Sequence, residues 1–244
     1  MIRKAGFGLL GLGLLIIVWL ALTLLYGDPV TAWYTRHKQQ ALSQRLDVID
    51  TQWAAKLAVR PAALSRHITA VSMGSEARDA ALARASRLRA AAIAFRRSLG
   101  EGQPIGRILI PRIHLKMVVV QGTSEGDLSK GPGHYDSASG QNTGLPGMGG
   151  VIGIAGHRTT FLQPFRHIDD LRPGDKIYLE MPYGTFSYTV YAHRVVASTD
   201  WTILHRRPFE KLVLSACHPL YSATHRWVVF ARLESHGAPV ATGA

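Results

Sequence analysis

The stretch that decides the fold is residues 211–233, KLVLSACHPLYSATHRWVVFARL. It holds two apolar runs, 211–216 and 226–233, separated by a polar segment that begins with His218-Pro219. Short apolar runs bounded by turn residues predict strands, and a proline cannot continue a strand ladder. This stretch therefore predicts two strands joined by a turn, with Cys217 at the mouth of the first strand.

Similar short runs punctuated by Gly, Pro and turn residues fill the chain upstream of this pair. Their spacing, with no long helical pattern between them, predicts an all-β barrel or sandwich. The expected further strands are 105–110, 117–121, 151–155, 176–180 and 185–196. The Gly/Pro-rich part between 131 and 150 predicts mostly loop. After Leu233 the tail, 234–244, has little to pack and is expected to be disordered.

The N-terminal part carries an uncharged apolar segment from Ala5 to Tyr26. At about 1.5 Å per residue, such a helix matches the roughly 30 Å core of a bilayer. It predicts a transmembrane anchor within residues 1–28, with a cleavable signal peptide as the alternative. Arg3 and Lys4 favour a cytoplasmic N-terminus. We expect a single-pass protein of the cell membrane whose main domain is extracytoplasmic.

Residues 29–100 carry helical periodicity and much of the positive charge. Apolar residues recur at steps of three or four up to Pro61, and a second helix is expected from an N-cap at Ser75 to about Leu99. The whole chain has 28 Lys and Arg against 16 Asp and Glu, and residues 36–97 hold twelve against four. This arm is either a solvated helical stalk or hairpin, or an arm whose basic face lies against anionic lipid or wall polymer. Much of the net charge therefore lies in this arm and not in the 101–233 domain, so no nucleic-acid partner is expected.

Cys217 is the only cysteine, which excludes an internal disulfide and a zinc site built on paired cysteines. A lone thiol is usually inert, but one at a strand mouth is accessible. Cysteine chemistry needs a partner that exchanges protons with it. His157 also follows an apolar strand and is the candidate, although His218 and His225 lie nearer in sequence.

Acyl transfer also needs a donor for the developing oxyanion, and a guanidinium supplies one. Two arginines in the last strand, Arg226 and Arg232, share a face by the alternation of side chains. They lie roughly 20 Å apart at about 3.3 Å per residue, so only one reaches the thiol. Arg226, nearer to the turn, is the candidate.

Three segments in this order, IAGHRTTFLQPF at 154–165, LRPGDKIYLE at 171–180 and LVLSACHPLYSATHRWVVFARL at 212–233, resemble sortases. The likeness is closest to class E sortases, because the segment KGPGHY at 130–135 also resembles a loop of that class. It covers residues 105–233. The resemblance implies an eight-stranded sortase-type β-barrel behind the transmembrane helix and helical arm. It assigns the nucleophile to Cys217, the acid/base to His157 and the oxyanion donor to Arg226.

The implied reaction cleaves the Thr–Gly bond of a Leu-Pro/Ala-x-Thr-Gly-like sorting signal and passes the secreted protein to an amine of peptidoglycan or another acceptor. We expect no cofactor and assign no metal-binding residue, and the sequence leaves metal dependence open. It places Tyr135, Ala216 and His218 at the substrate. Sortases usually have threonine before the cysteine. Ala216 lacks that hydroxyl, so the signal preference is expected to differ.

Three alternatives stay open on the sequence. One is another cysteine enzyme such as an L,D-transpeptidase, although no Ser-His-Gly-Cys stretch surrounds Cys217. Another is a sortase-like surface or assembly protein with impaired catalysis. The third is a pilin-polymerising sortase, whose Asp-Pro-aromatic lid has no counterpart here, because Asp28-Pro29 is followed by Val30.

Overall fold

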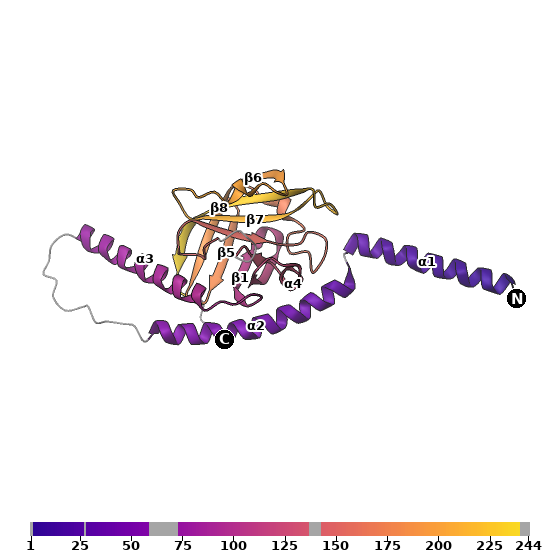
Figure 1. Cartoon of the computed structure of the whole chain (residues 1–244), viewed down its shortest axis with the longest axis horizontal. Helices are drawn as coiled ribbons and strands as arrows, with labels where there is room; N and C mark the ends of the chain where they lie inside the picture. The colour runs from indigo at the N-terminus through magenta and orange to yellow at the C-terminus, as the bar shows by residue number, and fades with distance from the viewer. Residues whose placement is uncertain (1, 27, 59–72, 137–142, 240–244) are drawn as a thin grey trace.

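Residues 2–26, 28–58, 73–136 and 143–239 are described in the computed structural model (Figure 1). Within α1 and α3, the side chains of residues 2–7, 22, 24–26 and 73–77 lie outside the description. The expected helix stop at Pro61 and the last five residues of the tail, 240–244, also lie outside the described residues.

A closed barrel of eight strands forms the body of the molecule, in the order β1-β2-β3-β4-β7-β8-β6-β5. This confirms the predicted mainly β barrel. Its strands are β1 (Pro104–Ile110), β2 (Leu115–Gln121), β3 (Gly133–His134), β4 (Val151–Ala155), β5 (Lys176–Met181), β6 (Gly184–Ala197), β7 (Lys211–His218) and β8 (His225–Gly237). Closure gives every strand a neighbour on both sides, although β3 pairs with only two residues each of β2 and β4.

Every expected strand is present, and the structure adds β3. This two-residue strand pairs in parallel with β2 and antiparallel with β4, and so bridges the gap between them. It lies in the stretch predicted to be mostly loop, because two residues are too few to show a period of two.

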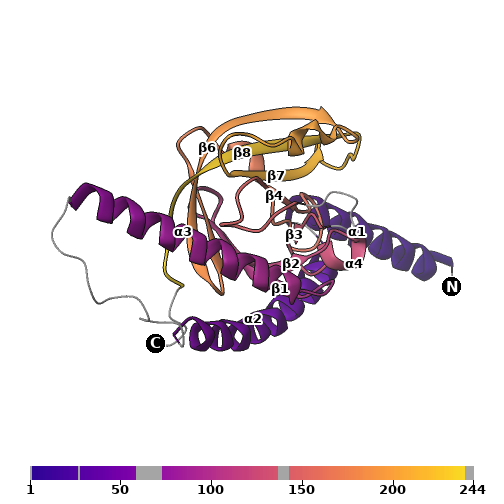
Figure 2. The ribbon, with the colours of Figure 1, turned by 60° about the vertical axis from the view of Figure 1, so that its left-hand side comes forward.

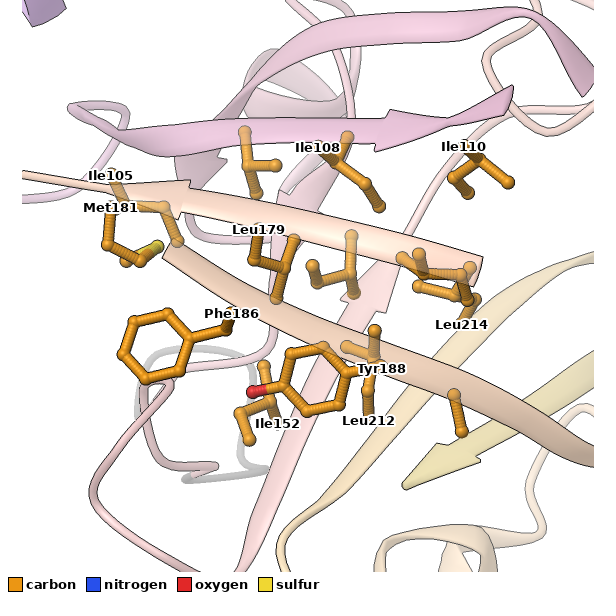
Figure 3. Close-up of a cluster of buried hydrophobic side chains, with 14 of the residues drawn as sticks. Ile105, Ile108, Ile110, Ile152, Leu179, Met181, Phe186, Tyr188, Leu212 and Leu214 are labelled. Atoms are coloured by element: carbon orange, nitrogen blue, oxygen red, sulfur yellow. The ribbon is translucent and has the colours of Figure 1, made fainter. Parts of the chain in front are cut away.

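The barrel interior is filled by apolar side chains that alternate along the strands (Figure 3). Ile108 and Ile110 of β1 are fully buried, as are Leu212 and Leu214 of β7. Tyr188 of β6 is also fully buried, and its hydroxyl donates to Glu210 Oε1 at 2.6 Å. The two buried residues of β1, and likewise the two of β7, are two positions apart in the sequence, so one face of each strand points into the core.

The helical arm packs against the barrel, which corrects the expectation of a solvated stalk. Helix α2 (Pro29–Ala58) lies along one side of the barrel in both views (Figures 1 and 2). Its buried side chains include Leu42 and Leu46, which form a cluster with Val118 and Val120 of β2. Polar side chains reinforce the contact, because Gln39 Nε2 donates to the carbonyls of Val118 (3.0 Å) and Lys130 (2.7 Å). The Gln39 amide thus serves as an extra partner for the edge of β2.

The second helix of the arm, α3 (Met73–Arg97), completes the core at one end of the barrel. Phe95 is 1% exposed, and its ring lies 5.3 Å from that of Trp53 on α2 and 5.6 Å from that of Tyr183. Burying such a ring contributes about 1.5–3 kcal/mol, which fastens the two helices to the barrel. The helix begins at Met73, so Ser75 lies inside it and is not its N-cap, contrary to the prediction.

The C-terminal strand is longer than predicted. β8 continues through Glu234 to Gly237, where it pairs with Thr185 of β6. Disorder was therefore the wrong expectation for residues 234–237. Backbone pairing with β6 orders this part, although its own side chains are exposed and polar.

Helix α1 (Ile2–Tyr26) projects beyond the barrel toward the N-terminus (Figure 1). Its apolar side chains are exposed, with Leu10 at 71% and Leu15 at 67%. Among the helix residues whose side chains are described, which in α1 are 8–21 and 23, no span is long and apolar enough to cross a membrane.

Candidate active site

Strand register places the three predicted catalytic residues in one row. β7 and β8 run antiparallel with Cys217 directly opposite Arg226. β4 runs parallel to β7 and ends with Ala155 opposite Ser215, so His157 follows two residues later, as Cys217 follows Ser215. The Gly156 N–H still donates to the Ser215 carbonyl at 3.1 Å, which carries the pairing toward His157. Adjacent strands lie about 4.8 Å apart, so neighbouring members of the row are within side-chain reach.

The row opens into a groove of about 250 Å³. Cys217, His157 and Arg226 all line it, as the sequence predicted. Two of the three predicted substrate-binding residues, Tyr135 and Ala216, line it as well. The groove brings together a thiol, an imidazole and a guanidinium, three kinds of group that can act as nucleophile, proton carrier and oxyanion donor in acyl transfer.

Cys217 is half-buried and lies near the end of β7, two residues before the exposed Pro219. It is therefore reachable from the groove, unlike the fully buried cysteines typical of cores. Beside it Ala216 is 3% exposed and also contacts the core.

His157 is held at the edge of the groove by its own loop. Its carbonyl accepts a hydrogen bond from Phe165 N at 3.0 Å, and its ring centroid lies 5.1 Å from that of Phe161. Burial lowers the pKa of His157, with Glu125 opposing the shift. The neutral ring is therefore favoured near pH 7, so it is ready to accept a proton. Nε2 is buried and has no hydrogen-bond partner among the described residues.

The guanidinium of Arg226 is positioned by the turn that precedes β8. Its Nη1 donates to the carbonyls of Ala223 (2.9 Å) and His225 (3.0 Å). These bonds hold one side of the fork and leave other N–H groups for the groove. Arg232 lies six residues further along β8, opposite Lys211, with its guanidinium over the ring of Phe209. Arg226, not Arg232, is therefore at the thiol.

Tyr135 forms part of the floor of the groove. Its hydroxyl lies 2.8 Å from Ser215 Oγ, and its ring meets that of Trp201 edge-on at 6.0 Å. Burial raises the pKa of Tyr135, so the hydroxyl stays protonated and can donate. The two hydroxyls form a polar spot two residues before Cys217. Such a spot is suited to orienting a peptide.

His218 is outside the set of residues that line the groove. Its Nδ1 lies 3.4 Å from Arg158 Nη1, and its ring centroid is 5.5 Å from that of Trp227. Successive side chains of a strand point to opposite faces, which turns His218 away from the face that carries Cys217. The placement gives no support to its predicted contact with substrate.

Arg158 is a residue of the site that sequence reasoning missed. It is 3% exposed, pairs with Asp169 Oδ1 at 2.7 Å, and directs Nη1 to the carbonyl of Cys217 at 3.5 Å. It therefore ties the His157 loop to the Cys217 backbone. Nothing in the local sequence distinguishes it from a surface arginine, because Cys217 and His218, which it contacts, lie about sixty residues away in the chain.

The connection between β6 and β7 supplies one wall of the groove through Ser198, Asp200, Trp201 and Ile203. Within it the short helix η3 (Trp201–Leu204) is capped by Asp200, whose side chain accepts from Thr202 N at 2.9 Å. Sequence analysis left this connection unassigned. Among the described residues, no group of three or more His, Cys, Asp or Glu side chains is arranged to hold a metal ion.

Comparison with known proteins decides the family. The sequence model of the sortase domain matches residues 108–234, just over half of the chain. This chain belongs to the sortase family. The match begins within β1 and takes in the other seven strands to Glu234 in β8. It therefore covers every strand that builds the row of Cys217, His157 and Arg226.

Two curated sortases illustrate the likeness. Sortase D of Bacillus subtilis (strain 168) is 32% identical over 137 residues, which cover 54% of this chain and 64% of that protein. Sortase SrtE1 of Streptomyces coelicolor is 29% identical over 148 residues, covering 56% of this chain and 42% of that protein. The chain thus spans less than two thirds of either relative. Sortases of several types match at similar identity, so the class E assignment stays a prediction.

Solved sortase structures agree in fold. The sortase E1 structure from Streptomyces coelicolor with a tripeptide in its active site has a TM-score of 0.53 and 28% identity, covering 56% of this chain and 91% of that one. A sortase D5 transpeptidase of Clostridium perfringens has a TM-score of 0.51 and 26% identity, covering 57% and 84%.

Proposed function

We propose that this sortase is a cysteine transpeptidase with Cys217 as its nucleophile. The observation that carries the proposal is the row of His157, Cys217 and Arg226 across three paired strands at one groove. Two structural neighbours support it, since one is titled a transpeptidase and the other holds a tripeptide in its active site.

In the first half-reaction the neutral His157 accepts the thiol proton as sulfur attacks the threonine carbonyl carbon of a Leu-Pro/Ala-x-Thr-Gly-like signal. Arg226 donates hydrogen bonds to the oxyanion that forms. The C–N bond to glycine then breaks, and His157 returns the proton to the leaving amine. The product is a thioester between Cys217 and the threonine carbonyl.

In the second half-reaction an acceptor amine, proposed to be that of peptidoglycan, attacks the thioester carbonyl. The C–S bond breaks, an amide forms, and the proton from the amine passes through His157 to the sulfur of Cys217. Tyr135 and Ala216 are proposed to contact the signal peptide, because both line the groove beside the thiol.

The test is to incubate the purified chain with Leu-Pro-x-Thr-Gly and Leu-Ala-x-Thr-Gly peptides and to record its intact mass. We expect a thioacyl adduct that maps to Cys217, disappears on addition of an amine, and is absent from Cys217→Ala. A chain that is folded yet forms no adduct across a library of candidate signals would instead support the alternative of a non-catalytic assembly protein.

We propose further that the chain is anchored in the cell membrane by the uncharged apolar segment from Ala5 to Tyr26, with the barrel on the extracytoplasmic side. The positive residues Arg3 and Lys4 support this orientation. We expect the full chain to resist alkaline carbonate extraction from membranes, and a chain lacking residues 2–26 to be released by it. Equal release of both would contradict the anchor.

A further inference from the structure

A second hollow lies on the other side of the β6–β7 connection from the groove. It has a volume of about 480 Å³ and shares only Ile203 with the lining of the groove. We call it the basic pocket, because six of its lining residues are of basic types: His193, Arg194, His205, Arg206, Arg207 and Lys211. The charge excess of the arm is visible in the sequence, but this concentration of basic side chains on the barrel is not, because its members come from separate elements.

Lys211 forms the buried end of the basic pocket. Lys211 is 3% exposed, and its Nζ donates to the carbonyls of Ile203 (2.8 Å) and His205 (2.7 Å). An ammonium has three donors, so one remains for a further acceptor. Burial, followed by the charges of Arg207 and Arg194, lowers the pKa of Lys211 to about 8.

The cations of the pocket are crowded. The guanidinium of Arg194 lies 5.4 Å from the centroid of the Phe230 ring, and the ammonium of Lys211 lies 5.5 Å from the same centroid. A single aromatic ring therefore holds two like charges. Such crowding costs free energy unless an anion offsets it.

Within the described chain, no carboxylate forms an ion pair with Arg194, Arg206, Arg207 or Lys211. The two carboxylates nearest in sequence are engaged elsewhere. Asp200 accepts from Thr202 N and Oγ1 at the start of η3. Glu210 is turned into the core, where it accepts from Tyr188 and from the backbone of Gly147 and Gly149. Asp200 still attracts Arg194 and His205 at longer range, so the protein offsets the positive charge of the pocket only in part.

We propose that the basic pocket binds a phosphate group. Guanidinium forks such as those of Arg194 and Arg207 match the oxygens of a phosphate, and Lys211 lines the same hollow. A phosphate carries more than one negative charge and three acceptor oxygens, which suits several cations around one concavity better than a single carboxylate does. The alternative is that the basic side chains of the pocket are solvated surface groups that bind no ligand specifically.

The experiment titrates inorganic pyrophosphate into the full chain, held in neutral detergent, by isothermal titration calorimetry. We expect saturable binding that weakens by about tenfold or more in Arg194→Ala/Arg207→Ala and weakens with added salt. Both arginines are exposed, so an unchanged melting temperature should show that this variant folds. The control Arg112→Ala/Lys116→Ala removes the same charge from two exposed positions, one just before β2 and one within it, and should bind like the parent chain.

Equal affinity in the two double variants, or no saturable binding by the parent chain, would overturn the proposal. Binding by Cys217→Ala should equal that of the parent, so this result is independent of transpeptidation. Repeating the titration in nanodiscs identifies the source of the phosphate. If pyrophosphate binds more weakly in phosphatidylglycerol discs than in neutral discs, a lipid headgroup competes for the pocket. Equal isotherms in the two kinds of disc indicate a free or polymer phosphate.

Discussion

Replacing Arg226 by alanine should lower the rate of thioacyl formation by about 10²–10³, the loss typical when one oxyanion donor is removed. The reason is geometric, because Arg226 is paired directly with Cys217 and its guanidinium lines the groove. The rate is measured with a quenched sorting-signal peptide under single-turnover conditions.

The matched control for this prediction is Arg232→Ala on the same strand. Arg232 is paired with Lys211, six residues or roughly 20 Å along β8 from Arg226. Its guanidinium lies over Phe209 and not at the groove. We expect the control to keep the parental rate within about twofold. An equal loss in both variants would refute the assignment of the oxyanion donor.

His157→Ala should lower transpeptidation by about 10²–10⁴, the range attributed to general acid–base catalysis. The burial that lowers the pKa of His157 keeps its ring neutral at pH 7, so the variant loses the group that takes the thiol proton. The decrease should appear in both half-reactions, acylation of Cys217 and transfer to the amine, and each is followed by mass spectrometry.

His225→Ala tests the same assignment from the other side. His225 is closer to Cys217 in sequence and, as the first residue of β8, is paired with His218. It is exposed and outside the lining of the groove. We expect near-parental activity from this variant. If His225→Ala were the more damaging of the two, the proton carrier would have to be reassigned.

Most strands of the barrel were predictable from the sequence because each is a short apolar run ended by turn residues. β4 has the predicted bounds, and β7 extends the predicted 211–216 only to His218. β3 was not predicted, because two residues are too few to show the two-residue alternation of a strand. The end of β8 escaped because its order comes from pairing with β6 and not from its own apolar side chains.

The arm shows the same limit. Its apolar stripe was visible in the sequence, and the structure confirms a helix there in α2. The surface that the stripe covers was not visible, since Leu42 and Leu46 pack on Val118 and Val120 some seventy residues later. A helical stripe indicates that a face will be buried, but it does not name the partner.

By itself, the sequence determined which residues can do the chemistry. It has one cysteine, placed where a strand must end before Pro219, a histidine at another strand end, and an arginine at the start of the last strand. The tertiary structure alone decided that these three strand ends are neighbours. β4 and β7 pair across about sixty residues, and the connection that separates the groove from the basic pocket is itself placed by that closure. Side-chain periodicity records which face of a strand is buried. It carries no information about which strand lies beside it, because that choice depends on closing the whole barrel.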